Sequence, residues 1–147
     1  MAIEIRKIKA SDRLQWDELW NGYQRFYEVD LTSVTETLWQ RLLDETDHTY
    51  PVGIVAAEGE NLVGLAHYLY YRSTWSDKDR IYLHDLYTLP DKRGKGIGRK
   101  LIEAIYEIAN NNDCETVFWM TQETNTTARV LYDKLANKTP FVEYSRD

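Results

Sequence analysis

The chain has 147 residues, of which 29% are charged and 43% hydrophobic, as is typical of a water-soluble domain with one core. No apolar run is long enough to span a bilayer, so we expect no membrane partner. The net charge of −6 argues against nucleic acid as a partner and suits a cationic one, such as an amine.

Cysteine and histidine usage argues against two kinds of site. Cys114 is the only cysteine, so the sequence predicts no disulfide framework. His48, His67 and His84 lack the spacing of metal ligands, and we expect no metal. The first residues alternate like a strand and lack the apolar core of a signal peptide, so we expect a cytoplasmic protein.

The N-terminal third predicts one strand followed by two helices. Residues 3–8 alternate between apolar and polar side chains, as a half-buried strand does. Ser11 and Asp12 resemble a helix cap, and apolar residues then recur at helical spacing to residue 27 and again over 33–43.

These two predicted helices are rich in aromatic residues. We expect Trp16, Trp20 and Trp39 in the core, while Tyr23, Tyr27 and Trp75 are candidates for lining a substrate pocket.

The rest of the chain predicts further strands and two more helices. Strand patterns at 52–58 and 62–71 flank Gly59-Glu60-Asn61, which predicts a hairpin. The further elements expected are a central strand at 81–89, a long helix at 96–110, a strand at 116–121, a helix at 126–136 and a closing strand at 141–144. This order predicts an α/β fold with a mixed sheet.

The glycine-rich segment Arg93-Gly94-Lys95-Gly96-Ile97-Gly98 joins the central strand to the long helix. Glycine lets the backbone approach a ligand, and free N–H groups at a helix N-terminus attract anions. A P-loop needs Gly-x-x-x-x-Gly-Lys-Ser/Thr, and a dinucleotide loop needs a third glycine where Arg99 stands, so neither fits. We predict a phosphate-binding turn, with an ordinary solvated turn as the alternative.

Two motifs carry a resemblance to a known family. One is Arg93-x-x-Gly96-x-Gly98, and the other is the run 124–135, which contains Asn125, Ala128 and Leu131-Tyr132. Together they resemble the two signature motifs of the GCN5-related N-acetyltransferases (GNAT family), and the chain looks most like bacterial relatives of the yeast Hpa-type enzymes. The resemblance implies a single N-acetyltransferase domain over 1–147, with a central mixed, twisted sheet flanked by helices. It also implies acetyl-CoA as co-substrate, held where the central strand splays from its neighbour.

The resemblance implies roles for individual residues. Tyr132 would be the general acid that protonates the leaving thiolate, and Asp85 and His84 would draw the proton from the amine. Strict alternation puts Ile81, Leu83, Asp85 and Tyr87 on one face, so His84 and Asp85 share a cleft only if a bulge intervenes. The residues expected to bind acetyl-CoA are Leu86, Tyr87, Thr88, Arg93, Gly94, Lys95, Gly96, Ile97, Gly98, Arg99 and Asn125.

Each role has a structural alternative. Tyr132 fits the apolar face of a helix, Asn125 fits an N-cap, and Asp85 fits a buried, hydrogen-bonded carboxylate. His84 stands where related enzymes carry a glutamate, which leaves the base open. The connection from Ala136 to Phe141 is longer than the family's Gly-Phe and could place the last strand at a subunit interface. Homodimers are common among similar enzymes, and we expect one.

The predicted function is direct transfer of an acetyl group from acetyl-CoA to a primary amine, without a covalent enzyme intermediate. The acceptor classes left open are small amines, amino acids, polyamines and protein lysines. The alternative is a catalytically weak acyl-CoA-binding sensor or interaction module, against which Tyr132 and Asn125 argue.

Overall fold

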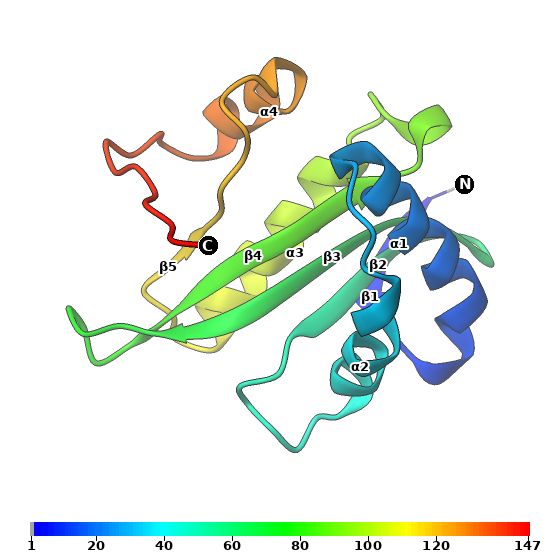
Figure 1. The fold of residues 1–147 in the computed structure, drawn as a ribbon, viewed down its shortest axis with the longest axis horizontal. Coiled ribbons are helices and arrows are strands. Elements are labelled where there is room, and N and C mark those ends of the chain that lie inside the picture. The colour runs from blue at the N-terminus through cyan, green and yellow to red at the C-terminus, as the bar shows by residue number, and fades with distance from the viewer. Residues whose placement is uncertain (1) are drawn as a thin grey trace.

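The computed structural model describes residues 2–147 and shows a mixed sheet with helices on both faces (Figure 1). Within these residues the sheet has five strands in the order β1-β2-β3-β4-β5. Their bounds are Ile3–Lys7, Val52–Glu58, Asn61–Arg72, Asp79–Thr88 and Thr116–Phe118. Neighbouring strands are antiparallel except β4 and β5, which are parallel. The prediction of an α/β fold with a mixed sheet is confirmed.

The helices cover the two faces of this sheet unequally. Helices α1 (Arg13–Tyr27) and α2 (Thr32–Leu43) pack on one face. Helix α3 (Ile97–Asn111) packs on the other face and provides the crossover that parallel strands require. Helix α4 (Thr126–Leu135) lies near the N-terminal part of α3, where Leu131 approaches Gly98 and the Tyr106 hydroxyl donates to the Leu135 carbonyl (Figure 1).

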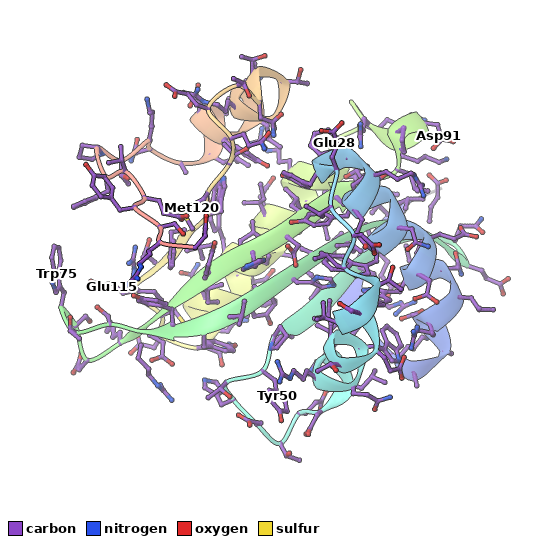
Figure 2. All side chains as sticks on the ribbon, in the orientation of Figure 1. Glu28, Tyr50, Trp75, Asp91, Glu115 and Met120 are labelled. Atoms are coloured by element: carbon purple, nitrogen blue, oxygen red, sulfur yellow. The ribbon has the colours of Figure 1, made fainter. Side chains whose placement is uncertain are left out.

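The aromatic residues of α1 and α2 form much of one core cluster. Trp16, Trp20 and Trp39 are 0%, 3% and 4% exposed, so their predicted place in the core is confirmed. Tyr87 of β4 packs beneath Gly22 so closely that a Cβ at position 22 would overlap its phenol ring. Trp75, in contrast, is 87% exposed and projects from the tip of the β3–β4 loop (Figure 2), so the suggestion that it lines a pocket is not supported.

The end of the chain differs from the prediction. Residues 136–147 form no helix or strand, so the predicted closing strand at 141–144 is wrong. A strand requires a hydrogen-bonding neighbour, and no strand within residues 2–147 pairs with this segment. The strand predicted at 116–121 also ends early, at Phe118, where its pairing with β4 stops.

A β-bulge in β4 changes which face each residue occupies. His67 of β3 pairs with Asp85, but the next residue, Tyr68, pairs with Leu83, so His84 is an extra residue on β4. As a result Leu83 packs in the α3 cluster, while Tyr87 packs in the α1–α2 cluster. The prediction that Ile81, Leu83, Asp85 and Tyr87 share one face is therefore wrong. His84 and Asp85 were expected to share a cleft only if a bulge intervened, and the bulge at His84 meets that condition.

Among residues 2–147, no helix is both long enough and apolar enough to cross a membrane.

Candidate active site

The splay between β4 and β5 leaves one edge of β4 open. The two strands pair only over Arg80–Tyr82, and after Phe118 the chain turns away from β4 toward α4 (Figure 1). From Leu83 onward, β4 therefore has no strand partner on this side among residues 2–147. Alternate N–H groups of Leu86–Thr88 are left free of sheet pairing, so the expected splay is confirmed.

The glycine-rich segment forms a turn with its amide groups free. Gly94 and Gly96 have φ of 75° and 80°, which strongly favours glycine at both positions. The first hydrogen bond of α3 is donated by Lys100 to the carbonyl of Gly96. Within the described chain, the six N–H groups from Gly94 to Arg99 have no hydrogen-bond acceptor. No atom lies within 4 Å of a Cβ built on Gly94 or Gly96, so the turn has room for an anion.

The three cations of this segment have different surroundings. The guanidinium of Arg93 lies over the rings of Phe26 and Tyr87, and its Nε donates to the carbonyl of Thr88 at 3.1 Å. Arg99 pairs with Glu103 on the same helix at 2.8 Å. Lys95 has no ion-pair partner among residues 2–147 and remains available to a ligand. Ile97 is 2% exposed, so only its backbone is open to one.

Asp85 is the centre of a hydrogen-bonded cluster below the open edge of β4. Its Oδ1 accepts the Tyr23 hydroxyl at 2.7 Å and lies 2.9 Å from His84 Nδ1, and its Oδ2 lies 2.9 Å from His67 Nδ1. Asp85 and His67 are 7% and 1% exposed, whereas the His84 side chain is 52% exposed. The arrangement places a buried carboxylate directly behind an accessible imidazole.

The protonation of this cluster follows from its contacts. Burial alone would raise the pKa of Asp85, but hydrogen bonds from His67, His84 and Tyr23 outweigh it and hold the pKa below its ordinary value. The hydrogen bond to Asp85 raises the pKa of His84 above 6.5, against the opposing effect of burial. Burial, and next the charge of Asp85, raises the pKa of Tyr23, which therefore stays protonated and donates. An ionised carboxylate thus faces an imidazole whose pKa it raises.

Tyr132 of α4 lies in a half-buried aromatic environment. Its ring meets Trp119 edge-on at 5.4 Å between centroids, and its neighbour Leu131 would contact a Cβ on Gly98 at 3.6 Å. Burial, and next the Tyr27 hydroxyl, raises the pKa of Tyr132 to about 12. The Tyr27 ring in turn packs at a tilt against Tyr23, with 4.7 Å between the ring centroids, and Tyr23 donates to Asp85.

Asn125 stands at the N-cap position of α4, but its side chain does not cap the helix. Its Nδ2 donates instead to Thr121 Oγ1 at 3.1 Å. The capping alternative is therefore not supported for the side chain, although the Asn125 carbonyl accepts the Arg129 N–H at 3.1 Å.

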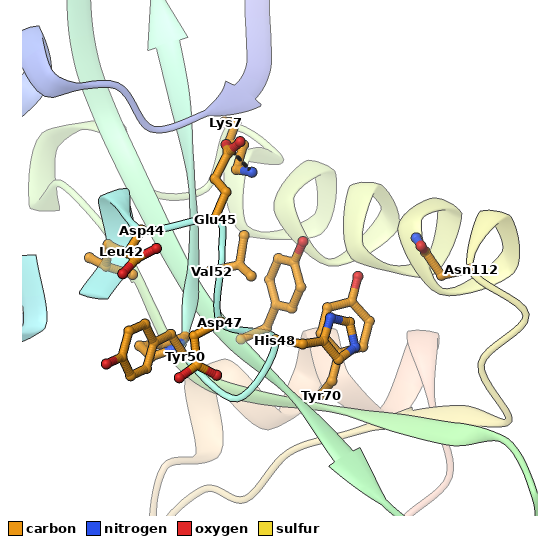
Figure 3. Close-up of a pocket in the computed structure, with 12 residues that line it drawn as sticks. Lys7, Leu42, Asp44, Glu45, Asp47, His48, Tyr50, Val52, Tyr70 and Asn112 are labelled. Atoms are coloured by element: carbon orange, nitrogen blue, oxygen red, sulfur yellow. Dashed lines mark ion pairs between the residues drawn. The ribbon is translucent and has the colours of Figure 1, made fainter. Parts of the chain in front are cut away.

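A pocket of about 250 Å³ lies at the other end of α3 (Figure 3). It is lined by the α2–β2 connection, by parts of β1, β2 and β3, and by Asn112 just beyond α3. The glycine-rich segment precedes α3, and a helix of 15 residues is about 22 Å long, so the pocket is remote from the predicted site. Its acidic residues have partners of their own, since Glu45 pairs with Lys7 while Asp44 and Asp47 accept from Thr46 and Thr49.

The structure gives little support to other catalytic groups. Residues 2–147 contain no group of three or more His, Cys, Asp or Glu side chains arranged to hold a metal ion. Burial raises the pKa of Cys114, which makes its thiol a weaker nucleophile at neutral pH.

His67 is the residue of the cluster to which the sequence analysis assigned no role in the site. It lies in the apolar run of β3, where a buried imidazole needs hydrogen-bond partners. That position was a signal in the sequence, but its partners Trp16 and Asp85 lie 51 and 18 residues away and only the fold brings them together.

Comparisons with known proteins agree with this architecture. A family model described as the acetyltransferase (GNAT) family matches residues 16–136. D-amino-acid N-acetyltransferase HPA3 of Saccharomyces cerevisiae is 34% identical over 146 residues, which cover 99% of this chain and 91% of that protein. The uncharacterized N-acetyltransferase YhfO of Bacillus subtilis is 31% identical over 147 residues, covering 97% of this chain and 95% of that protein.

A solved structure shows the same fold at low sequence identity. The structure of AAC(6')-Iy in complex with the bisubstrate analog CoA-S-monomethyl-acetylneamine superposes with a TM-score of 0.84 at 18% identity. The alignment covers 100% of this chain and 99% of that one.

Proposed function

This chain belongs to the acetyltransferase (GNAT) family and is an acetyl-CoA-dependent N-acetyltransferase, and from this premise we propose that its acceptor is the amine of a small molecule of the amino-acid class. The family membership establishes acetyl transfer to amines in general. The acceptor class is suggested by HPA3, whose name gives D-amino acids as its substrates and whose similarity to this chain extends over nearly its full length.

The observation that carries the mechanism is the His84–Asp85 pair on the bulged β4 strand. An acceptor ammonium must lose a proton before its nitrogen can attack a thioester. His84 is accessible, and the adjacent carboxylate of Asp85 raises its pKa and would stabilise the imidazolium that forms. The surrounding Tyr23, Tyr27 and Tyr82 rings add aromatic surface that favours a cation.

The remaining steps follow the order of bond changes. His84 Nε2 takes the amine proton, and the neutral nitrogen attacks the thioester carbonyl carbon. Free N–H groups on the Leu86–Thr88 edge of β4 would stabilise the resulting oxyanion. The attacking nitrogen gives up its second proton to solvent as the carbon–sulfur bond breaks. Tyr132 protonates the leaving thiolate and regains one proton from solvent, which balances the second proton lost by the nitrogen. The products are the N-acetylated amine, free coenzyme A and one proton released from His84.

Acetyl-CoA would bind across the open edge of β4 and the turn before α3. Its pyrophosphate fits the free N–H groups of Gly94 to Arg99, with Lys95 and Arg93 nearby as cations. We propose backbone contacts from Leu86, Tyr87 and Thr88 to the pantetheine arm. Asn125 would contact the same arm or a phosphate.

We further propose that residues 1–147 are one N-acetyltransferase domain and that two copies form a homodimer. Support for the dimer is the C-terminal segment, where Phe141, Val142 and Tyr144 are 77%, 78% and 93% exposed. Large apolar side chains gathered in one exposed segment are typical of an interaction surface.

The proposal is tested by thiol release from acetyl-CoA across a panel of L- and D-amino acids, polyamines and lysine-containing peptides, with calorimetric binding of acetyl-CoA to the same sample. We expect kcat/KM to be highest for an amino acid. A clear preference for polyamines or peptides would overturn the acceptor class. Tight acetyl-CoA binding without turnover on any amine would favour the sensor alternative.

A further inference from the structure

His67 lies beneath the His84–Asp85 pair with both ring nitrogens in hydrogen bonds. Its Nε2 is 3.1 Å from Nε1 of Trp16, and its Nδ1 is 2.9 Å from Oδ2 of Asp85. Trp16 and His67 are 0% and 1% exposed, so water does not compete for either contact. Trp16, His67, Asp85 and His84 therefore form one hydrogen-bonded line from the core to the surface.

The hydrogen positions on His67 follow from Trp16. An indole N–H can only donate, so His67 Nε2 must accept and carries no proton. The proton of the neutral ring is then on Nδ1, from which it is donated to Asp85 Oδ2. Trp16 thus sets the tautomer of His67 and, through it, occupies one oxygen of the Asp85 carboxylate.

The hydrogen positions on His84 follow from Asp85. The other carboxylate oxygen, Oδ1, accepts the Tyr23 hydroxyl and faces His84 Nδ1. Because an ionised carboxylate only accepts, His84 Nδ1 carries the proton and Nε2 keeps its lone pair. Nε2 has no hydrogen-bond partner among residues 2–147, and the His84 side chain is half exposed.

We propose that Trp16 and His67 are positioning residues for acetyl transfer, which hold Asp85 so that His84 presents an unprotonated Nε2 to the acceptor amine. This proposal rests on the function proposed above. Without the Trp16 N–H, His67 can bind a proton at Nε2 and become a cation beside Asp85. The Asp85 carboxylate would then interact with a charged His67 as well as with His84. It would orient His84 less firmly and stabilise its imidazolium less.

Other titratable groups near His84 must be considered in any pH experiment. Asp85 and Tyr82 on β4 contact His84, and His67 on β3 and Tyr23 on α1 contact Asp85. The charge of Asp85 acts in turn on Tyr27 of α1, and that of Tyr27 acts on Tyr132 of α4. The charge of Glu143 in the C-terminal segment acts on Tyr82. Each of these tyrosines keeps its proton at neutral pH, because burial raises its pKa. A midpoint near neutral pH would therefore report a histidine.

The first experiment measures the tautomers without using activity. The chain has 3 histidines, so the imidazole nitrogens in a ¹⁵N NMR spectrum can be assigned by replacing each histidine in turn with glutamine. We expect His67 to carry its proton on Nδ1 and none on Nε2, and His84 to titrate. A proton on His67 Nε2 at neutral pH would overturn the proposal.

The second experiment compares two tryptophan variants. Trp16→Phe removes the donor to His67, while Trp39→Phe removes the same ring volume from the same core cluster, where the two rings lie 4.9 Å apart. For Trp16→Phe we expect kcat to fall roughly tenfold and the pH midpoint of kcat/KM to shift, with KM for acetyl-CoA unchanged. Trp39→Phe should retain the wild-type kcat and midpoint.

Equal losses of kcat in the two variants, or an unshifted midpoint in Trp16→Phe, would mean that Trp16 acts only through packing. If the wild-type protein transfers acetyl groups to no amine, the proposed function fails. The nitrogen spectra would still show whether His67 has the expected tautomer, so a failure of the proposed function can be told apart from a failure of the hydrogen-bonded line.

Discussion

Asp85 and His84 are adjacent, but their surroundings suit them to different tasks. The hydrogen bonds around Asp85 hold its pKa below the ordinary value, and a carboxylate of such low basicity accepts a proton poorly at neutral pH. The contact with Asp85 raises the pKa of His84, which makes this imidazole the stronger base of the two groups. In our proposal His84 is therefore the base, and Asp85 orients it and stabilises its charged form.

Tyr132→Phe tests the proposed general acid. We expect kcat to fall about 100-fold, because the thiolate loses its proton donor, while the affinity for acetyl-CoA stays nearly unchanged. Steady-state kinetics and calorimetry on the same protein measure the two quantities. Tyr106→Phe is a matched control, since the Tyr106 hydroxyl donates only to the Leu135 carbonyl between α3 and α4. A wild-type kcat in Tyr132→Phe would remove the acid from the mechanism.

At the level of elements, the turn before α3 was the most predictable part of the site. Its glycine spacing is local, and the positive φ of Gly94 and Gly96 is what such spacing indicates. The face of each β4 residue was less predictable. Alternation assumes a regular ladder, and the bulge at His84 arises from pairing with β3, which no local pattern of β4 reveals.

Gly96→Asp tests the turn as an anion site. We expect acetyl-CoA binding to be lost, since the new carboxylate would enter the open space beside the free N–H groups. Gly96→Asn is the matched control, because asparagine has the same shape without the charge and tolerates positive φ better than most residues. Calorimetry should show weakened binding for Gly96→Asn and none for Gly96→Asp. Equal affinities in the two variants would show that charge is unimportant there.

For the whole molecule, the sequence predicted the order of elements but not the end of the chain. Helices and hairpins depend on local spacing and were found close to their expected positions. The segment from Phe141 to Tyr144 has the apolar pattern of a strand but no neighbour within residues 2–147. The hydrogen-bonded line of Trp16, His67 and Asp85 could not be predicted from the sequence either, because its members come from three elements that only the fold brings together.

The exposed C-terminal segment leads to a prediction about assembly. We expect the wild-type protein to sediment as a dimer and the double variant Phe141→Ser, Val142→Ser to sediment as a monomer, since it loses apolar surface that the proposed interface would bury. Val34→Ser, at an exposed valine of α2, should remain dimeric. A monomeric wild-type protein would contradict the proposal, as would a dimer in all three proteins.

The central claim, that His84 takes the proton of the acceptor amine, is tested most directly by the pH dependence of kcat/KM in the wild type and in His84→Gln. A base must be unprotonated, and Asp85 raises the pKa of His84, so wild-type kcat/KM should rise with pH through a midpoint above 6.5. In His84→Gln this limb should disappear and kcat/KM should fall about 100-fold, leaving only the titration of the substrate amine. A His84→Gln protein that keeps the wild-type rate and the same limb would contradict the account.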